Sequence, residues 1–136
     1  MSLKKLIPKT LPTPFARYSH GVVIEAGSRT LVCSGQLGIG LDAVVPESAG
    51  MQAALCFDHI GALLSAAGMT PADVVRVNAF VTDRVYLEDY MAARDEFFWA
   101  VESPPASTLM IVSGFSREAF KVEVEVLAAA DGETHD

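Results

Sequence analysis

Two glutamates near the C-terminus, Glu123 and Glu125, have the spacing that most directly suggests chemistry. They alternate with valines in the segment 121–126, and residues i and i+2 of a β-strand project from the same face, roughly 6–7 Å apart. A solvated strand face is the simpler interpretation of such a pair. Leu127 shares the glutamate face, however, and partial burial there would raise the pKa of a carboxyl group. Such a group could act as a general acid or base near neutral pH.

Four further polar residues fall at the ends of expected strands or in loop junctions, where functional sites often form. They are Tyr18, Ser34, Ser107 and Thr108. Each type also has an ordinary structural role, because hydroxyls at strand ends satisfy backbone groups and tyrosines contribute packing. Position alone therefore does not assign a function to them.

The histidines and cysteines form no recognisable metal motif. His20, His59 and His135 show no ligand spacing with one another or with Cys33 and Cys56. We therefore expect no metal site, and no segment calls for another cofactor. The two cysteines are most simply interpreted as small apolar core residues.

Length, composition and charge argue against several classes of protein. The chain has 136 residues and a formal net charge of −7, which suits one acidic domain. Its Lys and Arg residues are scattered, whereas binding to nucleic acid or to a membrane surface requires clustered positive charge. No apolar run approaches the ~20 residues that cross a bilayer. With two cysteines and no recognisable secretion signal, the expected location is the cytoplasm.

Hydrophobic periodicity predicts the element order β-β-α-β-α-β-β. Ser48 and Gly68 suit the two caps of the first long helix. The second long helix follows Asp83 and is stopped by the prolines at 104–105. The expected strands are 18–24, 30–33, 74–81, 108–112 and 121–126.

Shorter features complete this prediction. Turn residues at 26–29 favour a hairpin between the first two strands. After the second strand of this hairpin, an irregular loop that contains Gly35, Gly38 and Gly40 is expected to run to Pro46. Pro71 stands at the first helical position of a one-turn helix over 70–73.

These elements predict an α+β fold, in which both helices pack on one face of a mixed sheet. The other face must then meet water or another subunit. We expect residues 1–14 to form an N-terminal arm or extended edge, residues 15–130 a single domain, and residues 131–136 a polar tail.

Several short motifs, in a fixed order from about Phe15 to Ala130, carry a resemblance to a known family. They are Tyr18-Ser19-His20-Gly21, Cys33-Ser34-Gly35-Gln36-Leu37, Ala66-Ala67-Gly68, Ala72-Asp73-Val74-Val75, Val81-Thr82-Asp83, Glu96-Phe97-Phe98, Pro105-Ala106 and the closing segment 122–128. Together they resemble the reactive-intermediate deaminase (Rid) family, also called the YjgF-like or L-PSP endoribonuclease family. The resemblance implies a chorismate-mutase-like sheet backed by two helices. It also implies a homotrimer that binds small molecules in clefts between subunits.

The resemblance also implies a chemistry, because archetypal members hydrolyse imines and enamines to keto acids and ammonia. In those members a glutamate on the last strand orients water, and its position matches Glu125. Their cleft tyrosine matches Tyr18, and Ser34 and Gly35 match the loop that lines the pocket. Ser107 occupies the position of the arginine that clamps the substrate carboxylate.

Two more positions depart from the family pattern. Leu109 stands where a cysteine is frequent, and Met91 where an asparagine is expected. Ser cannot replace the charge of a bidentate arginine. Ser107 and Thr108 could offer neutral hydrogen bonds instead, and whether Arg17, Arg76 or Arg94 reaches the cleft stays open at this point.

Two functional hypotheses follow. The first is an imine or enamine hydrolase for a small metabolite that needs no α-carboxylate clamp, with Glu125 orienting water. The second is a trimeric small-molecule-binding protein without catalysis. The older family name implies ribonuclease activity, and the charge of −7 argues against it.

Overall fold

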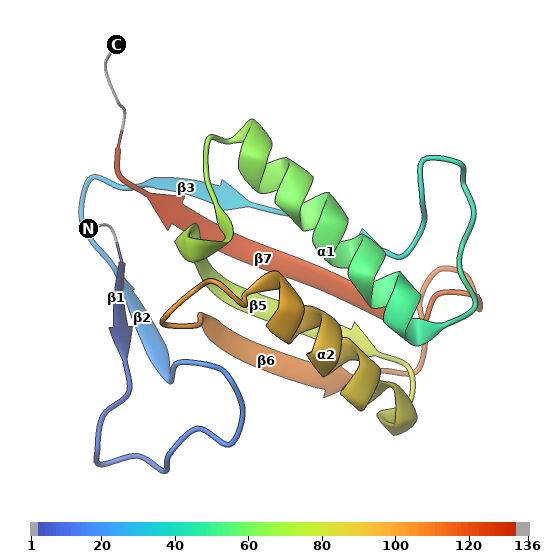
Figure 1. Cartoon of the computed structure of the whole chain (residues 1–136), viewed down its shortest axis with the longest axis horizontal. Coiled ribbons are helices and arrows are strands. Elements are labelled where there is room, and N and C mark those ends of the chain that lie inside the picture. The colour runs from blue at the N-terminus through green and yellow to red at the C-terminus, as the bar shows by residue number, and fades with distance from the viewer. Residues whose placement is uncertain (1–2, 133–136) are drawn as a thin grey trace.

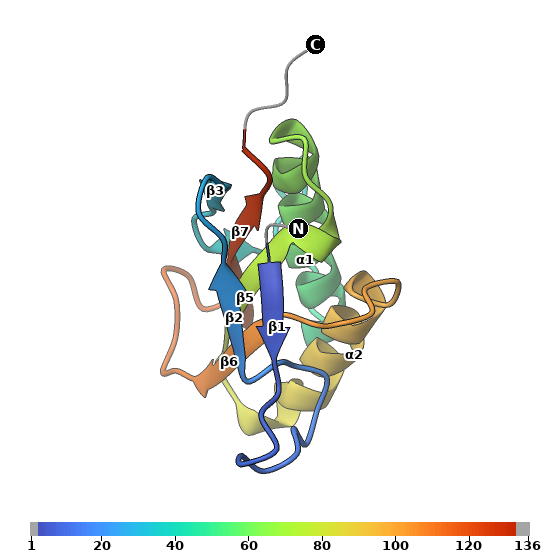
Figure 2. The ribbon, with the colours of Figure 1, turned by 90° about the vertical axis from the view of Figure 1, so that its left-hand side faces the viewer.

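The computed structural model describes residues 3–132 of the chain. His135 and residues 133–136 of the predicted tail lie outside the described residues. Two long helices cover one face of a mixed five-stranded sheet, and a two-stranded ribbon lies beside one end of that sheet (Figure 1, Figure 2). The predicted α+β class, with both helices on a single face, is confirmed.

Strand β7 (Val122–Ala130) lies at the centre of the sheet. It pairs antiparallel with β3 (Arg29–Val32) and the short β4 (Gln36–Leu37) on one side, and with β5 (Val74–Val81) on the other. Strand β6 (Ala106–Ile111) pairs parallel with β5 and forms the outer edge. A parallel pair needs a long crossover connection, and the second helix of the fold provides it.

Helix α1 (Ala49–Ala66) begins and ends at the predicted caps. The hydroxyl of Ser48 accepts a hydrogen bond of 3.1 Å from the backbone N–H of Met51. Gly68, just beyond the other end, has a φ of +72°, a conformation that favours glycine. The predicted one-turn helix is a 3₁₀ turn, η1 (Pro71–Asp73).

Helix α2 (Leu87–Phe97) is shorter at both ends than predicted. Asp83 does cap a helical turn, but this turn is a separate 3₁₀ element, η2 (Arg84–Tyr86). The helix ends before the prolines, and Phe98 turns inward to stack edge-on against Phe97, with ring centroids 4.9 Å apart. Helix α2 thus ends about one turn earlier than the apolar pattern suggested, and the chain continues in a turn in which the Val101 N–H donates to the backbone oxygen of Phe98.

The predicted hairpin is wrong. Strand β2 (Gly21–Ile24) pairs with the N-terminal strand β1 (Leu3–Leu6), and β3 pairs with β7. The N-terminal segment, expected to be an arm or an extended edge, therefore contains strand β1, and Pro8, Pro12 and Pro14 follow it. The expected irregular loop also contains β4, whose two residues pair with β7. In both cases the partner is remote in sequence, and local turn chemistry does not reveal it.

Alternation along β7 separates the core from the opposite face of the sheet. Val122, Val124 and Val126 share one face of the strand and are buried beneath the helices. Glu123 and Glu125 occupy the intervening positions and are half-buried on the face that carries no helix. We call this helix-free surface the open face.

Gln52, on α1, is a fully buried polar side chain that joins two loops to the helix. Its amide nitrogen donates hydrogen bonds to the backbone oxygens of Pro46 (2.8 Å) and Ala119 (2.9 Å). Its amide oxygen accepts one from the backbone N–H of Lys121 (2.8 Å). These bonds hold the chain just before β7 in place. Gly38 packs so closely on Gln52 that a Cβ there would lie 2.5 Å from the Cβ of Gln52.

We predict that Gln52→Leu lowers the free energy of unfolding by about 3 kcal/mol, because three backbone groups lose their partners and each costs about 1 kcal/mol or more. Urea unfolding followed by circular dichroism measures the change. Gln36→Leu is the control, because the Gln36 side chain makes a single local bond to the backbone oxygen of Ser34. Equal effects of the two substitutions would contradict the prediction.

Candidate functional site

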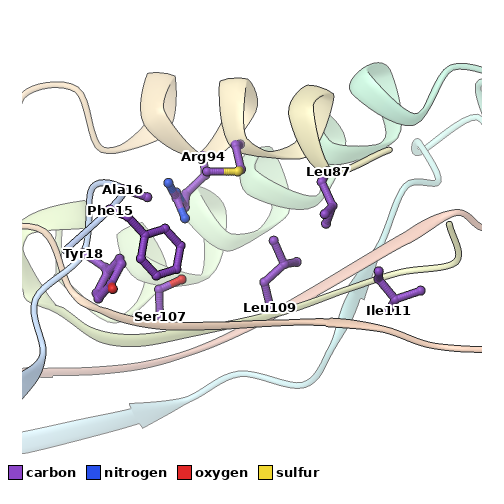
Figure 3. Close-up of a pocket in the computed structure, with 9 residues that line it drawn as sticks. Phe15, Ala16, Tyr18, Leu87, Arg94, Ser107, Leu109 and Ile111 are labelled. Atoms are coloured by element: carbon purple, nitrogen blue, oxygen red, sulfur yellow. The ribbon is translucent and has the colours of Figure 1, made fainter. Parts of the chain in front are cut away.

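A cavity of about 460 Å³ lies between α2, strand β6 and the loop before β2 (Figure 3). Its lining is mainly apolar, and Arg94 is the one charged residue in it. The side chains of Ser107, Leu109 and Ile111 rise from β6 toward α2. The full lining is Phe15, Ala16, Tyr18, Leu87, Met91, Arg94, Ser107, Leu109 and Ile111.

Four of the residues predicted to bind substrate meet at this cavity: Tyr18, Met91, Ser107 and Leu109. Tyr18 is held there by its buried neighbour Ser19, whose N–H donates to the backbone oxygen of Pro105 at 3.0 Å. This bond ties the Tyr18 loop to the chain just before β6. Two segments that lie almost ninety residues apart in the sequence are thus in direct contact beside the cavity.

Glu125 does not line the cavity. It lies on the open face, where the side-chain nitrogen of Asn78 donates a 3.1 Å hydrogen bond to its Oε2. Arg76 orients that amide by donating from Nε to the Asn78 side-chain oxygen at 2.7 Å. Arg76 also donates to the hydroxyl of Thr108. Oε1 of Glu125 has no hydrogen-bond partner among residues 3–132 and is free to bind a ligand.

The other predicted loop residues lie beside β7. Ser34 falls between Cys33, whose N–H donates to the backbone oxygen of Val126, and Gln36, which pairs with Val124, so the register sets Ser34 opposite Glu125. Gly35 lies against the side chain of Glu123. A Cβ on Gly35 would collide with the carboxyl group of Glu123, so this glycine allows the close approach. Burial, and to a lesser extent the charge of Glu125, raises the pKa of Glu123 above its usual range. The perturbed carboxyl group is thus Glu123, at the end of the glutamate pair away from Leu127.

Ser107 and Thr108, predicted to offer hydrogen bonds to one ligand, point to opposite faces of the sheet. Ser107 opens into the cavity, whereas Thr108 pairs in register with Asn78, and Asn78 with Glu125. Successive residues of a strand always diverge in this way. The predicted site therefore falls into two half-sites that the sheet separates within one chain. One is the cavity, and the other is the group of hydrogen-bonded side chains Glu125, Asn78, Arg76 and Thr108 on the open face, which we call the Glu125 cluster.

Three arginines were candidates to replace the missing clamp, and the structure assigns them different positions. Arg17 donates to the backbone oxygens of Phe98 (3.5 Å) and Val101 (3.0 Å), so its guanidinium is engaged structurally. Arg76 belongs to the Glu125 cluster. Arg94 alone of the three lines the cavity.

The two cysteines are buried and free, as predicted for core residues. Burial, followed by the charge of Glu123, raises the pKa of Cys56 to about 12. Burial also raises the pKa of Cys33. Neither thiol is therefore a ready nucleophile near neutral pH. Within residues 3–132, no three His, Cys, Asp or Glu side chains are grouped to hold a metal ion.

Comparison with known proteins decides the family. The model of the family described as Endoribonuclease L-PSP matches residues 9–130. The chain belongs to this family. Its fold is that of the Rid-family protein YyfB from Yersinia pestis, with a TM-score of 0.84 at 23% identity over 96% of this chain and 100% of that one.

Two relatives of this L-PSP family member are similar over most of their length. The RutC family protein YjgH of Escherichia coli strain K12 is 32% identical over 115 residues, 84% of this chain and 85% of YjgH. The 2-iminobutanoate/2-iminopropanoate deaminase of Dermatophagoides farinae is 30% identical over 138 residues, 96% of this chain and all of that one. The crystal structure of the Escherichia coli YjgF gene product aligns with a TM-score of 0.68 at 25% identity, over 92% and 97% of the two chains. In the described part of the chain no helix is long and apolar enough to span a membrane.

Sequence reasoning did not assign a role to several residues of this L-PSP family member's two half-sites. Leu87 is the first residue of α2 and lines the cavity, and an apolar pattern along a helix does not distinguish cavity residues from core residues. Asn78 falls in the alternating segment 74–81 as a polar residue between apolar ones, and that alternation was the available signal. Phe15 lies in the loop between β1 and β2, so no periodicity could reveal that it lines the cavity.

We predict that the Glu123 carboxyl group makes stability depend on pH. Because its pKa is higher in the folded protein, the folded state binds more protons between the two pKa values, and stability falls as pH rises through that window. Glu123→Gln removes this loss, so the free energy of unfolding of the variant relative to wild type should increase as pH rises above about 4.5. Thermal unfolding across that range measures it.

Glu118→Gln is the matched control, since Glu118 is an exposed glutamate in the loop before β7. A gain that has the same pH trend for both variants would contradict the assignment to Glu123. So would a gain for Glu123→Gln that stays constant with pH.

Proposed function

We propose that this protein is an imine or enamine hydrolase whose reaction takes place in clefts between the subunits of a homotrimer. The observation that carries the proposal is the division of the site. One chain has a cavity without a general base and, across the sheet, a carboxylate without a cavity. A neighbouring copy that sets its Glu125 against this cavity completes both half-sites.

The surfaces around the two half-sites support such an assembly. Phe15, at the cavity rim, is 93% exposed, which is unusual for so large an aromatic side chain. Val32 and Met110 are exposed large apolar side chains at open-face register positions. Apolar surface of this kind marks interaction sites. A contact between two different surfaces, repeated around a three-fold axis, closes a ring.

The proposed chemistry uses one water molecule and one carboxylate. Asn78 holds Oε2 of Glu125, which leaves Oε1 to accept a proton from water as its oxygen attacks the C=N carbon. The proton passes to the nitrogen to give a carbinolamine. Transfer of the carbinolamine's hydroxyl proton to the nitrogen, again through Glu125, then breaks the C–N bond and releases ammonia and a carbonyl compound. An enamine enters the same sequence after protonation at carbon gives the imine.

The cavity's residues define which substrates fit. On the β6 side of the cavity, Ser107 carries no charge, and the lining side chains Met91 and Leu109 make the cavity wall apolar. We therefore propose a substrate that is not held by a carboxylate on the reacting carbon. The 2-imino acids implied by the name of the Dermatophagoides farinae relative are then poor substrates. The buried free thiols Cys33 and Cys56 fit the reducing cytoplasm, where we propose that the protein acts.

We predict that Glu125→Gln lowers the turnover of imines at least ~100-fold, because the amide cannot take a proton from water. Imines are generated in situ by an amine or amino-acid oxidase, and semicarbazide capture reports their lifetime. The panel contains 2-iminopropanoate and carboxylate-free imines, and Glu118→Gln is the control. Unchanged turnover in Glu125→Gln would contradict the mechanism. No turnover of any imine by wild type would favour the trimeric binding protein without catalysis.

We predict a particle mass three times the chain mass of 14.5 kDa. The reason is that each half-site is incomplete without a neighbouring chain. Light scattering coupled to gel filtration at micromolar concentration measures it. A monomer under these conditions would contradict both the trimer and the cleft between subunits.

A further inference from the structure

Arg94 is a buried cation with an unusual position. Its side chain is 5% exposed, yet the guanidinium projects from α2 into the cavity, toward β6 and the Phe15 ring (Figure 3). Buried arginines are normally saturated by acids or carbonyl groups, because an uncompensated charge is costly away from water. The contacts of Arg94 therefore indicate what it is available to bind.

Those contacts leave part of the guanidinium free. Nε (3.2 Å) and Nη2 (3.1 Å) both donate to a single oxygen, Oδ1 of Asp95. Nη1 has no hydrogen-bond partner among residues 3–132. The Asp95 side chain is 39% exposed, so solvent screens its attraction for Arg94. A second acceptor that enters from the cavity can therefore be bound by the remaining donors.

The remainder of the cavity restricts the ligand that carries this acceptor. Leu87, Met91, Leu109 and Ile111 offer apolar surface, and Arg94 is the one cation in the lining. A dianionic phosphate would need further positive charge in such surroundings. A carboxylate matches both the single charge and the planar fork of a guanidinium. The apolar lining favours a hydrocarbon body attached to it.

We propose that Arg94 binds the carboxylate of an amphipathic ligand, and that an apolar chain separates this carboxylate from the reacting carbon. This inference rests on the proposed function for the reacting carbon, but the carboxylate site itself does not require catalysis. The carboxylate is bound by a side chain of α2, on the opposite side of the cavity from Ser107 on β6. Arg94 thereby selects for carboxylates that extend along the cavity.

Calorimetric titration with straight-chain monocarboxylates tests the proposal. The probes are acetate, hexanoate and hexanamide, which differ in chain length and charge. Hexanoate should bind, and acetate and hexanamide should bind at least ~10-fold more weakly, because each lacks either the apolar body or the charge. Failure of wild type to bind hexanoate, or equal binding of hexanamide, would overturn the proposal.

Variants at two adjacent positions separate recognition from structural support. Arg94→Gln should weaken hexanoate binding about 30-fold or more, because a desolvated charge-assisted pair is lost. Arg94→Lys should recover part of that loss. Asp95→Asn should strengthen binding, since it removes the negative charge that competes with the ligand carboxylate for Arg94. A purely structural Arg94 predicts weaker or unchanged binding in Asp95→Asn, and that result would contradict the proposal.

Two further variants keep this test independent of the catalytic proposal. Arg84→Gln removes an exposed arginine from η2 and should leave hexanoate binding unchanged. Glu125→Gln should retain hexanoate binding within about 3-fold while losing turnover. Binding that depends on Arg94 in a protein without turnover would overturn the hydrolase alone. Turnover that depends on Glu125, without any carboxylate preference, would overturn the Arg94 site alone.

Discussion

The alternation of side chains along β7 is the constraint on which the rest of the structure depends. The same nine-residue strand supplies valines to the helix layer and presents Glu123 and Glu125 on the open face. It also pairs with three other strands, so its register fixes theirs. A slip of one residue would expose the valines and bury the carboxylates, which is energetically prohibitive. Core packing therefore holds Glu125 in its orientation.

The same alternation on β6 divides the candidate site. Ser107 is directed to the helix side, where α2 stands off far enough to leave a cavity, and Thr108 is directed to the open face. No adjustment of side chains can bring Glu125 into the cavity of its own chain, because the sheet lies between them. The proposed function is thus tied to assembly, since catalysis and substrate binding are divided between two surfaces.

Much of this could be predicted where the signal is local. Both long helices, the caps Ser48 and Gly68, strand β5 and the alternation of β7 follow from periodicity and capping chemistry. The pairing of β2 with β1 could not be predicted, because either neighbour would satisfy its hydrogen bonds. The division of the site did not follow from the expected strand, which begins at Thr108; β6 begins at Ala106, so Ser107 and Thr108 are adjacent on it and point to opposite faces. The orientation of the Arg94 side chain toward the cavity could not be predicted, because it depends on how α2 packs against the sheet.

The most direct test of a site shared between chains is cross-linking, which requires no substrate. The double variant Ser107→Cys/Glu125→Cys places one thiol in each half-site, and both natural cysteines are buried with raised pKa values. A short bifunctional thiol reagent should then give covalent dimers and trimers on a denaturing gel. Either single variant should give neither product. Absence of covalent oligomers from the double variant, with both introduced thiols modified, would contradict the shared cleft.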